Sequence, residues 1–431
     1  MRHSLILVGL LGLLGLPSVS HAADLLYRTD HFLFTVPASD VLSWTSQEDA
    51  WTYAGEPVTP PQRLLADGDE PPIPPQGFAR STRAGYSEDA IRETLRLRVS
   101  NQFDRPAGSV TIDKTASGTV TFDGVGLPGR EADLDALVPL TIAALRNGVT
   151  DIEVPVIETQ PAITVASEEL RDLGIAEVVT VGESNYAGSP VNRRHNIAVG
   201  LARFNGHLIP QGAVFSFNER LGRVDGTTGY RKELVIKGDR TEPDYGGGLC
   251  QVSSTAYRGA WEYGFPIPQR INHSYAVSYY GPVGTDATVY PPNPDIKFTN
   301  DGPSALLIQT HGDEADHAYF IYYGTKDTRE SGVYGPFIWN RSSPPPDRTL
   351  ETTELPAGQR RKVGDRHPGL NAAWVRYVTM PDGTTKEEST VSIYQARPLF
   401  YEVGVGAGGT APEPNEPTPP SIDEPPSWID A

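Results

Sequence analysis

The residue best suited to covalent chemistry is Cys250, the single cysteine among the 431 residues of the chain. It follows Gly246, Gly247 and Gly248 and precedes a helical pattern over Gln251–Tyr263. Glycines let the backbone bend sharply and come close to a substrate. A helix N-terminus presents unpaired N–H groups and a partial positive charge, and both favour a thiolate. The segment therefore predicts a cysteine nucleophile, with the same N–H groups available to bind an oxyanion.

A thiol nucleophile needs a base, and the best candidate is His273. We expect His273 to begin the strand that follows the Cys250 helix and a proline-rich turn, because a helix returning to an adjacent strand brings such residues together. A neighbouring side chain from Asn272–Ser274, or Asp286, would orient the imidazole. The groups expected to support this pair are Gly246, Gly247, Gly248, Ser253, Ser254, Asn272, Ser274 and Asp286.

Other interpretations of these residues stay open. A lone cysteine is often a small buried hydrophobe, and a glycine triplet is often only a turn. No Lys-[Ser/Thr] pair follows the glycines, which disfavours a phosphate-binding loop. The histidines lack the spacing of metal ligands on one helix. Acids such as Glu219, Asp225 and Glu233 are more typical of a solvent-facing surface than of a glycosidase pair. We expect no metal and no cofactor.

Composition narrows the class of protein. The net charge of −18 argues against binding to nucleic acid, which depends on neutralising phosphates, and against docking on anionic lipid. Hydrophobic residues make up 38% of the chain, enough for folded cores. The 43 glycines and 39 prolines favour strands, turns and linkers over a helical bundle. A single cysteine excludes an intramolecular disulfide and a multi-cysteine zinc site.

The first residues have the pattern of a secretory signal peptide over 1–22. Arg2 and His3 precede an apolar run over 5–16, and residues 20–22 have the small-x-small form of a cleavage site. The run is too short to span a bilayer, so we expect cleavage near Ala22, with an uncleaved anchor as the alternative. No later stretch is long and apolar enough for a membrane span. The expected location is secreted, or in the cell envelope.

The remaining chain predicts a multidomain α+β protein with a strand-rich central domain. We expect an irregular N-terminal segment over 23–86, with strand-like pieces and proline-rich turns. Residues 87–170 predict a small α+β domain with a helix from Glu88 and a second helix over Glu131–Asn147.

Residues 175–330 form the densest region, with a helix at Asn192–Phe204 before the Cys250 helix. A linker over 331–348 leads to a small β module over 349–405, and an acidic, proline-rich tail over 406–431 predicts disorder. The expected strands are Ala213–Phe217, Tyr275–Tyr280, Ala287–Tyr290, Ile296–Phe298, Leu306–Gln309 and Tyr319–Tyr323, with Trp374–Met380 and Thr390–Tyr394 in the β module.

The motifs of the central domain resemble the VanW family, in the family's order over roughly 130 residues. Some members are L,D-transpeptidases in which the cysteine of the Gly-Gly-Gly-x-Cys motif is the nucleophile. The resemblance implies that this cysteine is Cys250, and it adds Gln251 to the supporting residues. Leu249 departs from the usual isoleucine without touching the thiol. The matching motifs are Asn192-Arg-x-His-Asn-Ile, Pro210-x-Gly-x-x-Phe-Ser-Phe-Asn, Gly229-Tyr, Gly246-Gly-Gly-x-Cys-Gln-Val-Ser-Ser-Thr-x-Tyr, Asn272-His-Ser and Thr285-Asp-Ala.

Two flanking segments show further resemblances. The region before the central domain, with Phe122-Asp-Gly-x-Gly126 and Pro161-Ala-Ile-Thr, is similar to a peptidoglycan-binding domain that often precedes VanW. Residues 349–405, with Leu355-Pro-Ala-Gly358, resemble a G5 module, which is associated with wall or aminosugar binding. The resemblances imply peptidoglycan stem peptides and glycan as partners.

The resulting hypothesis is a secreted cysteine acyltransferase of L,D-transpeptidase type. Cys250 would attack the carbonyl before the terminal D-alanine of a stem peptide, His273 would move the protons, and an amine of a neighbouring stem would accept the acyl group. The alternative is a non-catalytic peptidoglycan-binding envelope protein, linked to glycopeptide resistance or wall maintenance, in which Cys250 is structural. A Cys-His endopeptidase or amidase is a third possibility. An exposed Cys250 beside a base would favour an enzyme.

Overall fold

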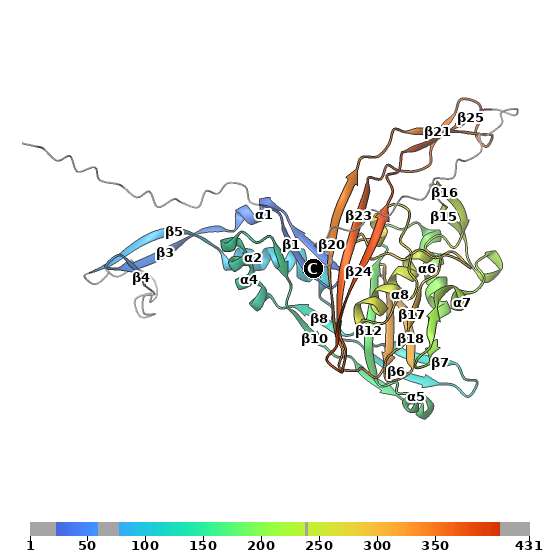
Figure 1. The fold of residues 1–431 in the computed structure, drawn as a ribbon, viewed down its shortest axis with the longest axis horizontal. Helices are drawn as coiled ribbons and strands as arrows, with labels where there is room; N and C mark the ends of the chain where they lie inside the picture. The colour runs from blue at the N-terminus through green and yellow to red at the C-terminus, as the bar shows by residue number, and fades with distance from the viewer. Residues whose placement is uncertain (1–22, 59–76, 238–239, 406–431) are drawn as a thin grey trace, which may run out of the picture. The chain divides into compact units, whose positions relative to one another are not determined.

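The structure, a computed structural model, describes residues 23–58, 77–237 and 240–405. It is a mixed α+β fold rich in strands, which confirms the predicted fold class (Figure 1). The predicted signal peptide, the proline-rich turns within 59–76 and the predicted tail lie outside the described residues. None of the helices in the described ranges is both long and apolar enough to cross a membrane.

The chain divides into two compact units, which are described separately. Of the described residues, the first contains 23–29, 33–58, 77–104 and 131–157. The second contains 30–32, 105–130, 158–237 and 240–405. The candidate functional residues all lie in the second unit.

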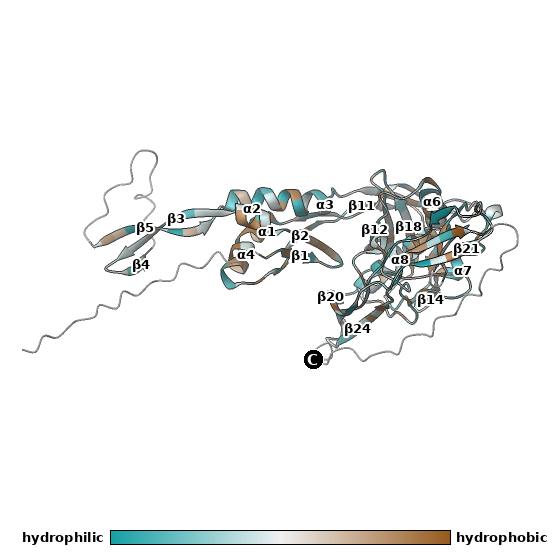
Figure 2. Ribbon diagram, turned by 90° about the horizontal axis from the view of Figure 1, so that it is seen from above, coloured by the Kyte–Doolittle hydropathy of each residue, from teal (hydrophilic) through white to brown (hydrophobic). Residues whose placement is uncertain are grey.

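The first unit combines a small sheet with amphipathic helices. Strand β1 lies between β2 and β9 and is parallel to β9. Ser87 caps helix α2, since its side chain accepts a hydrogen bond from the Ala90 N–H, and the helix buries Ile91 and Leu95. Figure 2 shows hydrophilic and hydrophobic residues side by side along α2. The bounds are β1 Leu25–Thr29, β2 Phe32–Val36, α1 Ala38–Ser43, β3 Thr45–Tyr53, β4 Glu56–Val58, β5 Phe78–Tyr86, α2 Glu88–Leu95, a π-helical turn Arg96–Ser100, α3 Asn101–Phe103, β8 Gly129–Ala132, α4 Leu134–Asn147, β9 Asp151–Glu153 and β10 Val156–Thr159.

The expectation of an irregular segment over 23–86 is wrong for its described residues, which form β1 to β5 and α1. The reason is long-range pairing. Strand β3 pairs along its length with β5, and β1 takes its partner β9 from more than a hundred residues downstream. Such pairing stabilises a strand without leaving a regular local pattern in the sequence.

The second unit is centred on helix α8 (Leu249–Tyr263) and an antiparallel sheet in the order β12-β19-β18-β13. The helix lies against β12 (Glu177–Asn185) through two glycines. A Cβ atom on Gly182 would lie 1.9 Å from the Thr255 carbonyl oxygen, and one on Gly259 would lie 2.5 Å from the Gly182 nitrogen. Only residues without a side chain permit this approach, which fixes the direction in which the N-terminus of α8 points.

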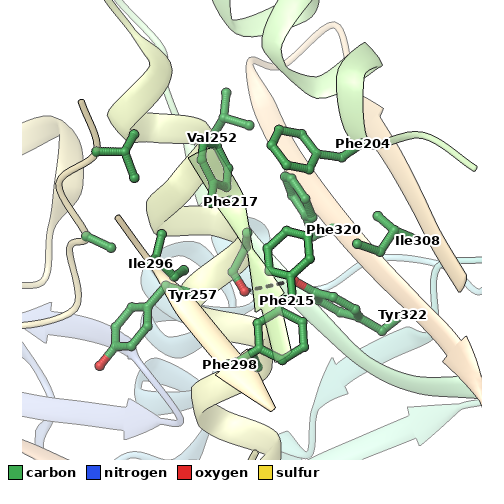
Figure 3. Packing of buried hydrophobic residues seen from close by; sticks show 14 of the residues in the cluster. Phe204, Phe215, Phe217, Val252, Tyr257, Ile296, Phe298, Ile308, Phe320 and Tyr322 are labelled. Carbon is green, nitrogen blue, oxygen red and sulfur yellow. Dashed lines mark hydrogen bonds between the residues drawn. The ribbon is translucent and has the colours of Figure 1, made fainter. Parts of the chain in front are cut away.

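The core of the second unit is an aromatic cluster that covers one side of α8 (Figure 3). Phe204 stacks on Phe217, with ring centroids 4.4 Å apart, and its ring centroid lies 5.4 Å from that of Phe320. The Tyr322 hydroxyl donates to the Ala256 carbonyl of α8 over 2.9 Å, so this buried phenol is paired. These contacts hold the helix that carries Cys250.

The C-terminal strands share this core. Strand β23 (Gly369–Thr379) lies between β20 (Glu330–Ser342) and β24 (Thr385–Tyr394), and Figure 1 shows the three long strands side by side. Trp374 of β23 is fully buried and meets Trp261 of α8 edge to face, with centroids 5.9 Å apart. Residues 330–342, most of which we expected to be linker, are therefore a paired strand.

Two predicted strands of the central region are absent. Residues 275–280 contain only a bend and a 3-10 turn at Ser278–Tyr280, and residues 287–290 have no regular structure. Prolines 282, 291, 292 and 294 lack N–H donors for a ladder. Isolated bonds hold the second stretch instead: the Ala287 N–H donates to the Ser254 side chain, and the N–H groups of Thr288 and Tyr290 donate to the carbonyls of Ile271 and Pro294.

The second unit contains further helices and strands along the chain. Their bounds are β6 Ser109–Lys114, β7 Val120–Val125, β11 Ala162–Val165, α5 Glu168–Asp172, α6 Val191–Phe204, β13 Leu208–Ile209, β14 Val214–Ser216, α7 Phe217–Leu221, a 3-10 turn Gly226–Thr228, β15 Lys232–Lys237, β16 Arg240–Tyr245, β17 Lys297–Thr299, β18 Leu306–Gly312, β19 His317–Gly324, β21 Arg348–Thr352, β22 Arg360–Lys362 and β25 Phe400–Gly404.

Candidate active site

Cys250 occupies the first turn of α8, directly after the glycine turn. Gly246 and Gly248 have φ of +84° and +111°, values that L side chains rarely adopt. A Cβ atom on Gly247 would lie 2.7 Å from the Leu234 carbonyl oxygen. Each of the three glycines is thus required by the turn that leads the chain into the helix.

The N-terminus of α8 leaves a backbone donor beside the thiol. The N–H groups of Leu249 and Gln251 bond to the carbonyls of Gly246 and Gly248, each over 3.0 Å. Among the described residues the N–H of Cys250 itself has no acceptor. This group, with the positive end of the helix dipole, is available to an oxyanion.

The thiol is partly buried and opens into a cleft of about 860 Å³. Its volume is in the range of small-ligand sites. The walls are the glycine turn, the hairpin β15–β16, the segment around His273 and the segment 288–294. The lining residues are Arg193, Arg223, Val224, Leu234, Val235, Ile236, Asp244, Tyr245, Gly246, Gly247, Gly248, Leu249, Cys250, Asn272, His273, Ser274, Tyr280, Thr288, Val289, Tyr290, Pro291, Asn293 and Pro294.

His273 lies in the same cleft, held by the carboxylate of Asp286. Its Nδ1 is 2.5 Å from Asp286 Oδ2, and its backbone N–H donates to the same oxygen over 2.7 Å. The ring stacks on Tyr280, with centroids 4.3 Å apart. Nε2 is buried and has no hydrogen-bond partner among the described residues, so it is the ring atom left for the thiol.

The expectation that His273 begins a strand is wrong. It lies in an irregular stretch between Gln269 and the 3-10 turn at Ser278–Tyr280. Its position is fixed by the two bonds to Asp286 rather than by a sheet ladder.

The electrostatics of the three groups favour an ion pair. Burial opposes the charged form of His273, but the hydrogen bond to Asp286 and the contact with Cys250 raise its pKa to about 9. Burial also opposes a thiolate, yet the neighbouring His273 imidazole and its charge lower the pKa of Cys250. Burial disfavours the Asp286 carboxylate, whereas His273 and Arg270 hold its pKa well below the usual range. A thiolate beside an imidazolium is the resting state that these shifts favour.

The supporting hydroxyls act on the backbone next to Asp286. Ser253 Oγ donates to the Ala287 carbonyl over 2.6 Å, and Ser254 Oγ accepts from the Ala287 N–H over 2.9 Å. They attach the chain carrying Asp286 to the first turn of α8. Gln251 points elsewhere: its side chain accepts from Arg193 over 2.8 Å and donates to the Tyr279 carbonyl over 3.3 Å.

Of the three residues considered as orienters of the imidazole, Asp286 is the one in contact with the ring. Asn272 donates through its side chain to the carbonyls of His273 and Ile393, each over 2.8 Å. The Ser274 carbonyl accepts from the Gln395 N–H over 2.7 Å. Asn272 and Ser274 therefore position the backbone on both sides of His273 and line the cleft.

Sequence reasoning missed three residues that complete the site. Arg270 donates to Asp286 Oδ1 over 3.2 Å and to the Asp286 carbonyl over 2.6 Å. Tyr394 donates to the same Oδ1 from β24. The Val289 carbonyl lies 3.7 Å from Cys250 Sγ. A buried tyrosine at the end of a predicted strand carries no local signal of such a role.

Within the described ranges, no group of three or more His, Cys, Asp and Glu side chains is placed to hold a metal ion. His273, the histidine that lines the cleft with the thiol, is hydrogen-bonded to Asp286 through Nδ1.

Comparison with known proteins finds similarity in the segment that carries the site. Residues 192–322, which include Cys250, His273 and Asp286, match the family model described as VanW like protein. The chain is also similar to the uncharacterized protein YoaR of Bacillus subtilis (strain 168). The two are 34% identical over 167 residues, which cover 38% of this chain and 52% of the relative. The chain thus spans about half the length of the curated relative that it matches.

Proposed function

We propose that this protein is a secreted cell-wall cysteine acyltransferase of L,D-transpeptidase type, acting on peptidoglycan stem peptides through a Cys250 thioester. The observation that carries the proposal is that Cys250 and His273 line one cleft at the N-terminus of α8, with Asp286 buried behind the imidazole and bound to its Nδ1. A VanW-like domain is consistent with a cell-wall protein. This proposal includes the stem peptide as substrate, the location in the cell envelope and a contribution of the flanking segments to glycan binding.

In the acylation step, the Cys250 thiolate attacks the carbonyl carbon before the terminal D-alanine. A C–S bond forms, and the carbonyl oxygen becomes an oxyanion near the Cys250 N–H and the dipole of α8. His273 is protonated because its hydrogen bond to Asp286 raises its pKa, and it then gives its Nε2 proton to the leaving amine. The C–N bond breaks, D-alanine leaves and a thioester remains.

In the transfer step, the amine of a neighbouring stem attacks the thioester carbonyl. Neutral His273 takes a proton from that amine, the C–S bond breaks, and the thiolate–imidazolium pair is restored. The new amide joins two stems. Water in place of the amine would give a carboxypeptidase.

The test is mass spectrometry of muropeptides from wall incubated with the protein. Wild type is expected to produce newly joined stems and free D-alanine. Cys250→Ala is expected to abolish both products while the protein stays folded, because loss of one thiol leaves only a small cavity. Cys250→Ser should be nearly inactive, since a hydroxyl is much harder to ionise than a thiol.

The same measurement separates the alternatives. Stems that lose only D-alanine, without new joints, would indicate a carboxypeptidase. Stems cut internally or released from the glycan would indicate a Cys-His endopeptidase or amidase. Wall binding with unchanged muropeptides, equal in wild type and Cys250→Ala, would indicate a non-catalytic wall-binding protein and would overturn the proposal.

A further inference from the structure

We propose that Tyr394 is a positioning residue for the Cys250–His273 pair and acts through Asp286. This inference rests on the proposed function, because it assigns a role within that same site. It also makes β24, which sequence placed in a separate wall-binding module, part of the active site.

The contacts of Tyr394 hold both the side chain and the backbone around Asp286. Its hydroxyl donates to Asp286 Oδ1 and accepts from the Gly284 N–H over 2.7 Å. The other carboxylate oxygen, Oδ2, is the one bound to His273. One oxygen is thus anchored by Tyr394 while the other is aimed at the imidazole, which fixes the rotation of the carboxylate.

The neighbours of Tyr394 on β24 and just beyond it bind the same region. Ser392 Oγ accepts from Arg270, the second donor to Asp286, over 2.7 Å. The Ile393 carbonyl accepts from Asn272, and the Gln395 N–H donates to the Ser274 carbonyl. Four consecutive residues therefore hold the chain on both sides of His273 as well as its carboxylate partner. A strand that only covered the domain would not need this set of polar contacts.

The surroundings keep the Tyr394 hydroxyl protonated. Burial and the Asp286 carboxylate both raise the pKa of this phenol above its ordinary value. The other charged or titratable groups that interact with Asp286 are His273, Arg270 and, on α8, Cys250, Tyr257 and Arg258. Tyr394 thus keeps its proton and can donate a hydrogen bond to Asp286.

The experiment measures the rate at which iodoacetamide alkylates Cys250 as a function of pH in the full chain. Because there is one cysteine, intact mass reports this site alone. Tyr394→Phe removes the hydroxyl, frees the carboxylate to rotate and leaves the Gly284 N–H unpaired. We expect the midpoint of the pH profile to rise by about one unit, with a roughly tenfold slower reaction below it. The matched control is Tyr377→Phe, a half-exposed tyrosine on the adjacent β23, which should leave the midpoint unchanged.

A double-mutant cycle shows whether Tyr394 acts through Asp286. In an Asp286→Asn background, Tyr394→Phe should add no further shift, whereas an independent structural effect would add. An unchanged midpoint in folded Tyr394→Phe, or additive shifts, would overturn this inference alone. A wild-type midpoint near the ordinary thiol value would instead overturn the proposed function. If Tyr394→Phe does not fold, the variant to measure is Ser392→Ala, which removes the acceptor that holds Arg270 beside Asp286. This variant should raise the midpoint of the alkylation profile, and an unchanged midpoint would overturn the inference.

Discussion

Replacing Asp286 with asparagine should raise the pH at which Cys250 becomes reactive. The pKa of His273 is about 9 instead of 6.5, although burial of the ring acts in the opposite direction. This difference corresponds to about 3 kcal/mol of stabilisation of the imidazolium, since each pKa unit is worth about 1.4 kcal/mol. Asparagine keeps the shape of the carboxylate but not its charge. His273 should then be neutral near neutral pH, and the thiol loses the cation that favours its ionisation.

The expected result is an upward shift of the alkylation midpoint by about two pH units, with about 100-fold slower labelling near neutral pH. Iodoacetamide labelling followed by intact mass gives this midpoint without any substrate. The control is Asp295→Asn, because Asp295 is also a buried carboxylate but bonds to Ser216 and Asn218 instead of His273. Equal midpoints in wild type and folded Asp286→Asn would refute the argument that Asp286 sustains the ion pair.

Three further outcomes follow from other parts of the structure. Transfer activity should fall as pH rises through about 9, because His273 then loses the proton that the leaving amine needs; steady-state rates against pH measure this. Gly248→Ala should lower the free energy of unfolding by about 1–3 kcal/mol and reduce thiol reactivity, since φ is +111° there; denaturant titration and labelling together check it. Trp374→Ala should destabilise the second unit by about 3–5 kcal/mol because Trp374 packs on Trp261, and unaltered melting would show that the C-terminal strands are independent.

The parts of the site that were predictable from sequence are those with local signals. Three glycines before an apolar helical pattern indicate a turn into a helix, and the structure has Cys250 in the first turn of α8. Asp286 was one of several candidate orienters, because spacing alone cannot distinguish a neighbour in the chain from a neighbour in space. The geometry selects it through its contact with Nδ1.

The parts that were not predictable depend on contacts between distant segments. The stretches 275–280 and 287–290 alternate in the sequence like strands, yet neither pairs in a sheet. The Ala287 N–H bonds to the Ser254 side chain, and the N–H groups of Thr288 and Tyr290 bond to the carbonyls of Ile271 and Pro294. Tyr394 reaches Asp286 across 108 positions of the chain. Strand β1 likewise finds β9 far downstream. Local periodicity carries no information about such partners.

Strand β24 lies near the end of the described chain, and this position affects the stage of folding at which the site can form. Contacts between residues far apart in sequence are slow to form, because the intervening loop must be closed first. A chain whose C-terminal strands have not yet docked lacks the Tyr394 contact, so its thiol should react only at a higher pH than the thiol of the folded chain. Reactivity of Cys250 at low pH then becomes a readout of completed folding. For the acyltransferase that we propose, the thiol would reach its full reactivity only after the fold has closed.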